Sequence, residues 1–331
     1  MKHGPFTSRR QTLALLGGAA ALPLLPGSAR ADLIPTLALY GPPAGPSITL
    51  AHAAATDALA DVAHTATVTA WRNPDELRAG LTSGEIALSV VPVQAAANLY
   101  NRGFPLRLAN VMTNGLLYII SEDPQINSIP DLAGRTIAVP FRGDTPEIIF
   151  GQLLAHHGME GEAAPTISYA ASPIEAMQLL LAGRVEAALT AEPSTTAGIL
   201  RGRQAEKTVR RAISIQEEWG AMTGAAPVLP QAGLAVTNRF MDEHGAALPA
   251  ILTALEGAVA GVNENPEAAA ADATGPLGTP APLLAASIPH SNLVARPAKE
   301  ARADVERMLS AMAGADMARL GGKMPDDGFF L

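Results

Sequence analysis

The residues best placed to do chemistry in this 331-residue chain follow four predicted strands. They are Tyr40 and Gly41, Pro92, the run Phe141-Arg142-Gly143-Asp144-Thr145, and Glu192. In open α/β sheets, ligands bind beyond the carboxyl ends of strands, where the strand order reverses. Two of these loops lead into predicted helices, whose free N–H groups and positive dipole end favour anions. Ser47 and Thr145 would each add a hydroxyl, and Arg142 would supply a cation.

Several of these residues have an alternative role. Asp144 fits a capping box with the glutamate three residues later, and its carboxylate would then occupy the N–H groups that an anion needs. Alternatively, Thr145 caps the helix and Asp144 faces the cleft. Glu192 either accepts a hydrogen bond from a ligand or pairs with Arg184 or Lys207.

The sequence lacks the patterns of an enzyme or a metalloprotein. It contains no cysteine, which excludes thiol nucleophiles, disulfides, Cys-ligated zinc and iron–sulfur clusters. Its seven histidines form no H-E-x-x-H or H-x-H motif, and no G-x-S-x-G elbow, phosphate-binding loop or dinucleotide fingerprint is present. We therefore expect no catalytic residue, no metal site and no cofactor.

Charge and composition exclude further classes of protein. The formal net charge is −8 and no block of Lys or Arg occurs, which argues against nucleic acid or an anionic membrane as a partner. Hydrophobic residues make up 48% of the chain, but Gly, Pro and charged residues interrupt them throughout. Beyond the N-terminal leader, we expect no segment to reach the ~18–20 apolar residues of a membrane span.

Residues 1–31 are typical of an export signal. The basic stretch Thr7–Leu13 matches the twin-arginine pattern, although an ordinary Sec signal is the alternative. An apolar run over Leu13–Leu25, a Pro-Gly breaker and the small-x-small site Ala29-Arg30-Ala31 follow. Without cysteine there is no lipid-attachment site, so the exported protein is expected to be soluble. Removal of four basic residues would leave 19 basic and 31 acidic residues, a net charge of −12.

One α/β unit is predicted twice in the mature chain. The first unit comprises a strand over 36–40, a helix capped by Ser47 and reaching residue 60, a strand over 65–71, a helix between Asn73 and Gly84, and a strand over 86–91. The second comprises a strand over 136–140, a helix from 144 or 145 to 157, a strand over 166–170, a helix between Ser172 and Gly183, and a strand over 185–191. Alternating elements of this length require parallel pairing and right-handed crossovers.

The remaining segments connect and complete these units. Strands are predicted over 106–111, 116–121 and 231–236, and long Ala-rich helices over 239–263 and 297–320. A chain that builds one unit, crosses to the second and returns has two crossovers, near residues 113–116 and 225–233. We expect these two crossovers to form a hinge.

Two stretches carry a resemblance to a known family. Residues 129–139, IPDLAGRTIAV, resemble the D-L-x-G-K/R-x-I-A-V segment that opens the second lobe of periplasmic solute-binding proteins. Residues 177–193, MQLLLAGRVEAALTAEP, resemble their helix–Gly–strand–E-P segment. The family is the nitrate/sulfonate/taurine type of ABC-importer binding protein, which also includes binders of pyrimidine precursors. The chain departs from it at residues 142–146, RGDTP, where the family commonly has Gly-Ser or Gly-Thr before a helix.

The resemblance implies a two-lobed periplasmic binding protein fold of type II. Each lobe would be a mixed, mainly parallel sheet flanked by helices, with lobe 1 over 32–113 plus 232–331 and lobe 2 over 114–231. It implies a non-enzymatic, monomeric periplasmic protein that captures a small anionic or polar organic solute. The solute would then pass to the permease and ATPase subunits of an importer. A pyrimidine-precursor binder, or an exported enzyme on the same fold, is the alternative.

Overall fold

Two mixed β-sheets organise the part of the chain that the computed structural model describes, namely Met1, residues 33–314 and residues 316–331. Apart from Met1, the predicted export signal lies outside the described residues. Residues 33–331 form one compact unit. We call the two five-stranded sheets sheet A and sheet B.

Sheet A has the strand order β2-β1-β3-β11-β4. Its strands are β1 (Leu37–Gly41), β2 (Ala66–Ala70), β3 (Leu88–Pro92), β4 (Leu106–Leu108) and β11 (Ala232–Thr237). Strands β2, β1 and β3 are parallel, whereas β11 is antiparallel to both β3 and β4. The antiparallel strand is the one that enters the sheet from the other half of the chain.

Sheet B repeats this pattern with the order β10-β6-β9-β7-β8. Its strands are β6 (Leu117–Ser121), β7 (Thr136–Pro140), β8 (Thr166–Ala170), β9 (Ala187–Ala191) and β10 (Arg210–Ser214). Strand β6 enters from sheet A and is antiparallel to β9 and β10, while β9, β7 and β8 are parallel. The predicted mixed sheets are therefore confirmed, with parallel and antiparallel pairings in equal number. A small third sheet pairs β5 (Asn110–Thr113) with β12 (Leu293–Pro297).

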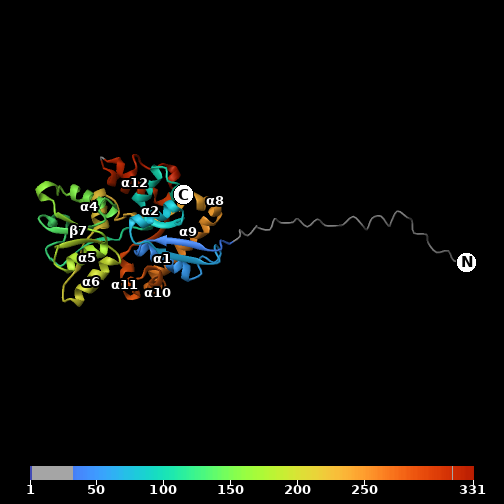
Figure 1. Ribbon diagram of the computed structural model, residues 1–331, viewed down its shortest axis with the longest axis horizontal. Coiled ribbons are helices and arrows are strands. Elements are labelled where there is room, and N and C mark those ends of the chain that lie inside the picture. The colour runs from blue at the N-terminus through green and yellow to red at the C-terminus, as the bar shows by residue number, and fades with distance from the viewer. Residues whose placement is uncertain (2–32, 315) are drawn as a thin grey trace. The chain divides into compact units, whose positions relative to one another are not determined.

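Helices follow the parallel strands of both sheets (Figure 1). They are α1 (Gly45–Ala55), α2 (Pro74–Ser83) and α3 (Val93–Asn101) after strands of sheet A, and α4 (Thr145–His156), α5 (Pro173–Leu181) and α6 (Ser194–Gln204) after strands of sheet B. Helix α7 (Ile215–Thr223) follows β10. Figure 1 shows α4, α5 and α6 gathered around β7, while α1, α2, α8 and α9 surround the strands of sheet A.

The predicted caps of two helices are confirmed. At the start of α2, the side chain of Asn73 accepts a hydrogen bond from the backbone N–H of Glu76 at 2.9 Å, and the helix ends at Gly84 with φ +78°. At the start of α5, the hydroxyl of Ser172 accepts from the N–H of the residue three positions later at 3.2 Å, and Gly183 follows with φ +65°. A side-chain acceptor at the N-terminus and a left-handed glycine at the C-terminus together fix both ends of each helix.

The long C-terminal helices predicted over 239–263 and 297–320 are wrong in their extent. The structure has α8 (Asn238–His244), α9 (Leu248–Glu264), α10 (Pro266–Leu277), α11 (Ala281–Ser287) and α12 (Ala298–Ala313). Gly245 ends α8 and opens a single 3₁₀ turn, and Pro249 in the first turn of α9 has no N–H to continue the preceding helix. Gly314, with φ +52°, ends α12 before a separate 3₁₀ turn over Met317–Leu320.

The expectation that no segment reaches the length of a membrane span is also corrected. Residues 238–264 are long and apolar enough to cross a membrane by length and composition. This stretch comprises α8, a 3₁₀ turn and α9, and α9 packs against α1 and β12. Its buried residues Ile251, Leu255, Ala258 and Val262 recur every three or four positions, as on the inner face of an amphipathic helix.

The two passages of the chain between the sheets lie side by side. The first crossover, residues 114–116, joins β5 to β6, and the second crossover, residues 224–231, joins α7 to β11. The hydrogen bonds that hold them are Leu229 N–H to Asn114 O (2.9 Å), Leu116 N–H to Gln231 Oε1 (3.5 Å) and Asn292 Nδ2–H to Gly115 O (2.7 Å). The crossovers thus form one bonded junction beside the turn that precedes β12.

The geometry at Gly115 predicts that this junction tolerates no side chain. Its φ is +124°, and a Cβ there would lie 2.7 Å from Cβ of Gln216. We expect Gly115→Ala to lower the free energy of unfolding, measured in urea, by about 1–3 kcal/mol more than Gly322→Ala. Gly322 is the matched control because its φ is +102° but no atom lies within 4 Å of its Cβ position. Equal destabilisation by both substitutions would contradict a close-packed junction.

Candidate functional site

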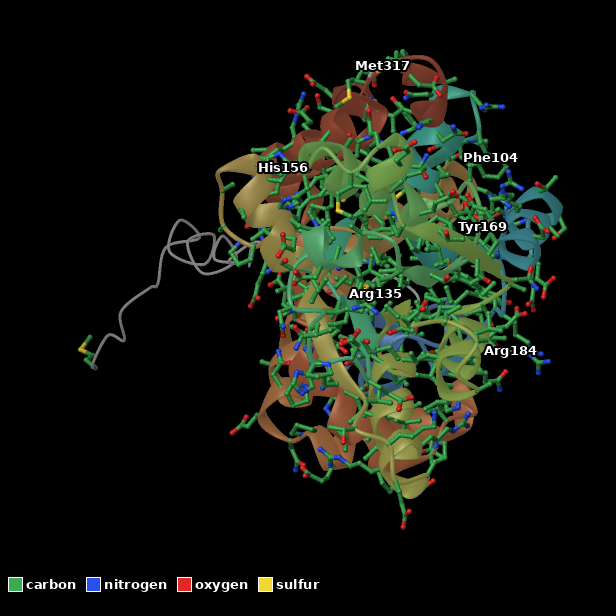
Figure 2. All side chains as sticks on the ribbon, turned by 90° about the vertical axis from the view of Figure 1, so that its left-hand side faces the viewer. Phe104, Arg135, His156, Tyr169, Arg184 and Met317 are labelled. Carbon is green, nitrogen blue, oxygen red and sulfur yellow. The ribbon has the colours of Figure 1, made fainter. Side chains whose placement is uncertain are left out.

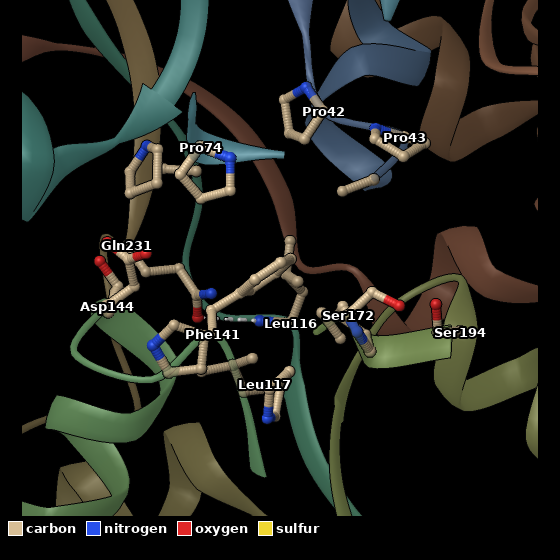
Figure 3. Close-up of a pocket in the computed structure, with 18 of the residues that line it drawn as sticks. Pro42, Pro43, Pro74, Leu116, Leu117, Phe141, Asp144, Ser172, Ser194 and Gln231 are labelled. Carbon is tan, nitrogen blue, oxygen red and sulfur yellow. Dashed lines mark hydrogen bonds between the residues drawn. The ribbon is translucent and has the colours of Figure 1, made fainter. Parts of the chain in front are cut away.

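A cavity of about 540 Å³ lies between the strand ends of the two sheets. Its wall includes residues from the loops after β1, β2 and β3 of sheet A and after β7, β8 and β9 of sheet B. Figure 3 shows Pro42, Pro43 and Pro74 on one side and Phe141 and Ser172 on the other. These loops all follow the carboxyl ends of parallel strands, where α/β folds bind ligands, and the volume is that of a small-molecule site.

Six of the ten residues predicted as ligand contacts line this cavity. They are Pro92, Phe141, Gly143, Asp144, Thr145 and Glu192. The cavity wall does not include Tyr40, Gly41, Ser47 or Arg142. Phe141 has φ +56°, an unusual backbone conformation for a residue with a side chain, and residues held in this way cluster at functional sites.

Thr145, the first residue of α4, presents an unused hydroxyl in this wall. The residue is 3% exposed, and its Oγ1 has no hydrogen-bond partner. The N-cap residue of α4 also makes no side-chain hydrogen bond to the first turn, in contrast to the capped helices α2 and α5. A buried polar atom without a partner is costly unless something else satisfies it. Thr145 therefore provides a hydrogen-bonding group at the N-terminus of a twelve-residue helix.

Ser47 is not the N-cap that the sequence predicts. Helix α1 starts at Gly45 after Ala44, which places Ser47 at its third position. Its hydroxyl is fully buried without a partner, against Gly41, where a Cβ would lie 2.2 Å from Ser47 Oγ. Tyr40 packs partly buried against the hydrophobic core. None of these three residues lines the cavity, although their neighbours Pro42, Pro43, Ala44 and Pro46 do.

The structure has neither of the two predicted caps of α4: Asp144 does not bond to the first turn, and Thr145 is the first helical residue and not the N-cap. Asp144 occupies the N-cap position of α4, but its side chain does not cap the helix. Its Oδ1 instead accepts a hydrogen bond from Arg78 of α2 at 3.2 Å. Burial raises the pKa of Asp144, and the neighbouring Arg78 partly offsets this. Because the Arg78 side chain is 49% exposed, this ion pair between the two halves is weak, ~1 kcal/mol or less.

Glu192 is fully buried and fully hydrogen-bonded by protein groups. Its Oε1 accepts from Nε of Arg211 at 2.9 Å, and its Oε2 accepts from the hydroxyl and N–H of Thr196 at 2.7 and 3.2 Å. Its partner is thus neither Arg184, whose side chain extends from the surface in Figure 2, nor Lys207, which pairs with Glu122. Burial raises the pKa of Glu192 against the lowering effect of Arg211. We assign Glu192 the role of bracing the loop that lines the cavity.

Arg142 lies beside the cavity instead of in its wall. It lines an adjoining, more open hollow that shares Phe141, Gly143 and Asp144, among others, with the cavity. Its guanidinium stacks over the ring of Tyr169 with Cζ 4.7 Å from the ring centroid. The Tyr169 hydroxyl in turn donates to Oε1 of Glu147 at 2.6 Å. This stacked cluster on the outer side of the loop accounts for the position of Arg142.

The cations of the cavity wall are four arginines that the sequence analysis did not single out. They are Arg72, Arg78, Arg201 and Arg319. Arg78 pairs with Asp75 and Asp144, and Arg319 lies 3.7 Å from Asp316. Arg72 lies two residues after the end of β2, so the strand-end rule, applied to every parallel strand, would have found it. Arg201 is on the last turn of α6, where no local sequence signal indicates proximity to the cavity.

The rest of the wall is dominated by rigid apolar groups. Ten of the lining residues are prolines, namely Pro42, Pro43, Pro46, Pro74, Pro92, Pro140, Pro146, Pro173, Pro193 and Pro280. Trp71, Leu99, Ile148, Ile174 and Leu283 also contribute. The cavity thus combines an apolar wall with a few charged or unpaired polar groups.

The family of the chain follows from a comparison of its sequence with models of protein families. The model described as NMT1/THI5 like matches residues 72–269, which is more than half of the chain. The chain belongs to the NMT1/THI5-like family. No curated protein matches the chain in sequence.

Solved structures similar to this NMT1/THI5-like protein include an ABC transporter protein and two periplasmic binding proteins. An ABC transporter protein from Parabacteroides distasonis has a TM-score of 0.72 at 23% identity, covering 91% of this chain and 99% of its own. The periplasmic aliphatic sulphonate binding protein SsuA from Escherichia coli has a TM-score of 0.68 at 18% identity, covering 88% of this chain and 94% of its own. The periplasmic nitrate-binding protein NrtA from Synechocystis PCC 6803 has a TM-score of 0.60 at 16% identity, covering 76% and 69%. The predicted periplasmic binding protein fold is confirmed.

The buried Glu192 predicts a specific dependence of stability on pH. Its raised pKa means that, above the ordinary value of 4.5, the folded protein holds a proton that the unfolded chain has released. The free energy of unfolding of the parent, relative to Glu192→Gln, should therefore rise as the pH falls from 7 towards 4.5. Urea titrations at several pH values measure this difference. Glu206→Gln, which removes an exposed carboxylate, is the control; a flat difference for Glu192→Gln would contradict the raised pKa.

Proposed function

We propose that this NMT1/THI5-like protein is the substrate-binding component of an ABC importer that captures a small organic anion. The observation that carries the proposal is the cavity itself, where the unpaired hydroxyl of Thr145 at an uncapped helix N-terminus lies within a wall that contains four arginines. N–H groups at a helix N-terminus and guanidinium groups both favour anions. The protein would bind its solute without changing it chemically.

The ligands of proteins with similar solved structures support this proposal. SsuA from Xanthomonas axonopodis pv. citri is described as an alkanesulfonate-binding protein bound to MOPS, and it has a TM-score of 0.65 at 18% identity. NrtA is described as nitrate-binding. Both ligand classes are anionic, and the proteins share the fold of this chain.

Local charge supports an anionic ligand despite the acidic chain. The wall of the cavity has four arginines against two carboxylates, Asp144 and Glu192, and each of these carboxylates already pairs with an arginine. The net negative charge of the whole chain acts over longer distances, which salt screens beyond ~8 Å. The arginines and the helix terminus act inside that distance, so they dominate at the site.

We further propose that the protein has two lobes, residues 32–113 with 232–331 and residues 114–231, which close over the ligand. The bonded junction of the two crossovers would be the hinge, and the pair Arg78–Asp144 would be a weak contact across the closing face. A ligand that binds the closed state best shifts the population towards it.

A planar neutral ligand is the second candidate. Trp71 and Phe141 both line the cavity and could stack on a heterocycle such as a pyrimidine precursor. The charge of the ligand that co-purifies with the protein, identified by mass spectrometry, separates the two candidates.

Thr145 provides the test of the anion site. The anion that raises the melting temperature most is first selected from a panel of sulfonates and carboxylates. Thr145→Val should weaken the binding of this anion by about 1.5–3 kcal/mol, the range for a hydrogen bond to a charged group. The fold should tolerate this change because the hydroxyl has no partner within the protein. Small-angle scattering of the same mixtures measures the closure of the lobes, which should lower the radius of gyration when the anion binds.

Arg142→Ala is the matched control for this experiment. Because its guanidinium stacks on Tyr169 outside the cavity wall, its removal should leave the affinity unchanged within about twofold, while Thr145→Val lowers it. Loss of binding in Arg142→Ala with retention in Thr145→Val would contradict the proposed site.

The proposed location is the periplasm, where a soluble, monomeric protein would deliver its solute to the permease and ATPase subunits. Export by the twin-arginine pathway predicts that the mature chain begins at Asp32, directly after Ala29-Arg30-Ala31. Replacement of Arg9 and Arg10 by Lys should then block export. N-terminal sequencing of the periplasmic fraction measures both, and unimpaired export of the double-Lys form would overturn the pathway.

A further inference from the structure

The size of the cavity exceeds what a small inorganic anion can fill. Its volume is about 540 Å³, whereas a nitrate-sized ion displaces one or two waters of ~30 Å³ each. The remaining space would hold water against walls that are largely apolar. Pockets of this size usually bury most of the surface of an organic ligand.

The wall has few groups that could bond to such water or to a polar ligand body. Proline has no N–H, so the ten lining prolines offer apolar rings without backbone donors. Several polar groups of the wall are already engaged: the indole N–H of Trp71 donates to Ser89 at 3.1 Å, the hydroxyl of Ser172 accepts from the first turn of α5, and Glu192 is fully bonded. A ligand body that needs no hydrogen bonds fits this wall best.

Ile174 adds an independent observation. It lines the cavity from the first turn of α5 and is 49% exposed, one of few large apolar side chains exposed in the described part of the chain. An apolar side chain at the rim of a cavity lowers the free energy when a ligand covers it. Ile174 therefore indicates that the apolar surface available to a ligand extends to the rim of the cavity.

Among the polar groups of the wall that remain available to a ligand, three belong to side chains that favour an anion. Thr145 at the start of α4 has an unpaired buried hydroxyl, and the guanidinium groups of Arg72 and Arg201 make no hydrogen bond or ion pair among the described residues. These groups suit one anionic head, while the remaining wall suits an apolar body.

We propose that the solute is an amphiphilic organic anion with a rigid apolar body, and not a nitrate- or taurine-like ion. This inference rests on the proposed function of the cavity. The acidic head binds at Thr145 and the arginines, and the body packs among the prolines, Trp71 and Ile174.

The test compares three anions, one zwitterion and one neutral analogue by titration calorimetry with the mature protein. The anions are 2-naphthalenesulfonate, butane-1-sulfonate and nitrate, the zwitterion is taurine, and the neutral analogue is 2-naphthalenemethanol. Burial of an aromatic body at ~25 cal/mol per Å² predicts that naphthalenesulfonate binds at least about 50-fold tighter than taurine. Its heat-capacity change should also be the more negative, because apolar surface is buried.

The outcomes separate the inference from the proposed function. Taurine or nitrate binding as tightly as naphthalenesulfonate would overturn the inference and leave a binder of small anions. Naphthalenemethanol binding as tightly as the sulfonate would overturn the anionic ligand itself. Binding of none of the anions at millimolar concentration would overturn the proposed function, and the inference with it.

A pair of surface variants locates the apolar body. Ile174→Gln should weaken naphthalenesulfonate binding about five- to tenfold and leave taurine binding unchanged. Met317→Gln is the control, because Met317 is 38% exposed and lies outside the cavity wall. Figure 2 shows Met317 well separated from Tyr169, which lies near the end of β8, the strand that leads to α5 and Ile174. Equal weakening of both ligands by Ile174→Gln, or of neither, would contradict the placement of the body at this rim.

Discussion

The hydrogen-bonded junction of the two crossovers is the constraint on which the geometry of the site depends. Leu116 illustrates this, since its N–H faces Gln231 of the other crossover while its carbonyl accepts the N–H of Glu192 from sheet B at 3.0 Å. The junction thereby sets where the strand ends of sheet B lie relative to those of sheet A. Glu192 extends the constraint through Arg211 and Thr196 to the start of α6.

Where a local signal fixes an element, the sequence was sufficient to predict it. Asn73 with Gly84 and Ser172 with Gly183 mark helix ends through capping bonds and left-handed glycines, and these ends agree with the structure. Where the choice depends on packing, the sequence was insufficient. Ser47 was expected to cap a helix, but the chain begins that helix three residues earlier, with Ala44 as the N-cap, and buries the hydroxyl of Ser47 against Gly41. The cavity and its Arg72 could be located from the strand-end rule, whereas Arg201 could not, because it reaches the cavity only through the packing of α6.

The charged groups near the cavity fall into two sets: groups that pair with one another and hold the Glu192 loop, and groups that are free to bind a ligand. The pair Glu192–Arg211 is buried, and the guanidinium of Arg211 also lies 5.4 Å from the ring centroid of Tyr118, whose hydroxyl donates to the carbonyl of His290. Burial and the same arginine lower the pKa of His290. The Glu192–Arg211 pair therefore has a structural role, because breaking a buried pair would leave an uncompensated charge. Thr145 and the guanidinium groups of Arg72 and Arg201, by contrast, line the cavity without a side-chain partner among the described residues.

The prolines of the wall affect how the site recognises shape. A proline ring has almost no side-chain rotamer entropy to lose, and its φ is fixed before any ligand arrives. A wall with ten such residues is therefore preorganised, so binding sacrifices little conformational freedom. The same stiffness prevents the wall from remodelling around a solute of the wrong outline. Each part of the wall would then keep its local shape when the lobes close. Selectivity would depend on how well a solute fits that shape, and affinity among related solutes should fall steeply with mismatch.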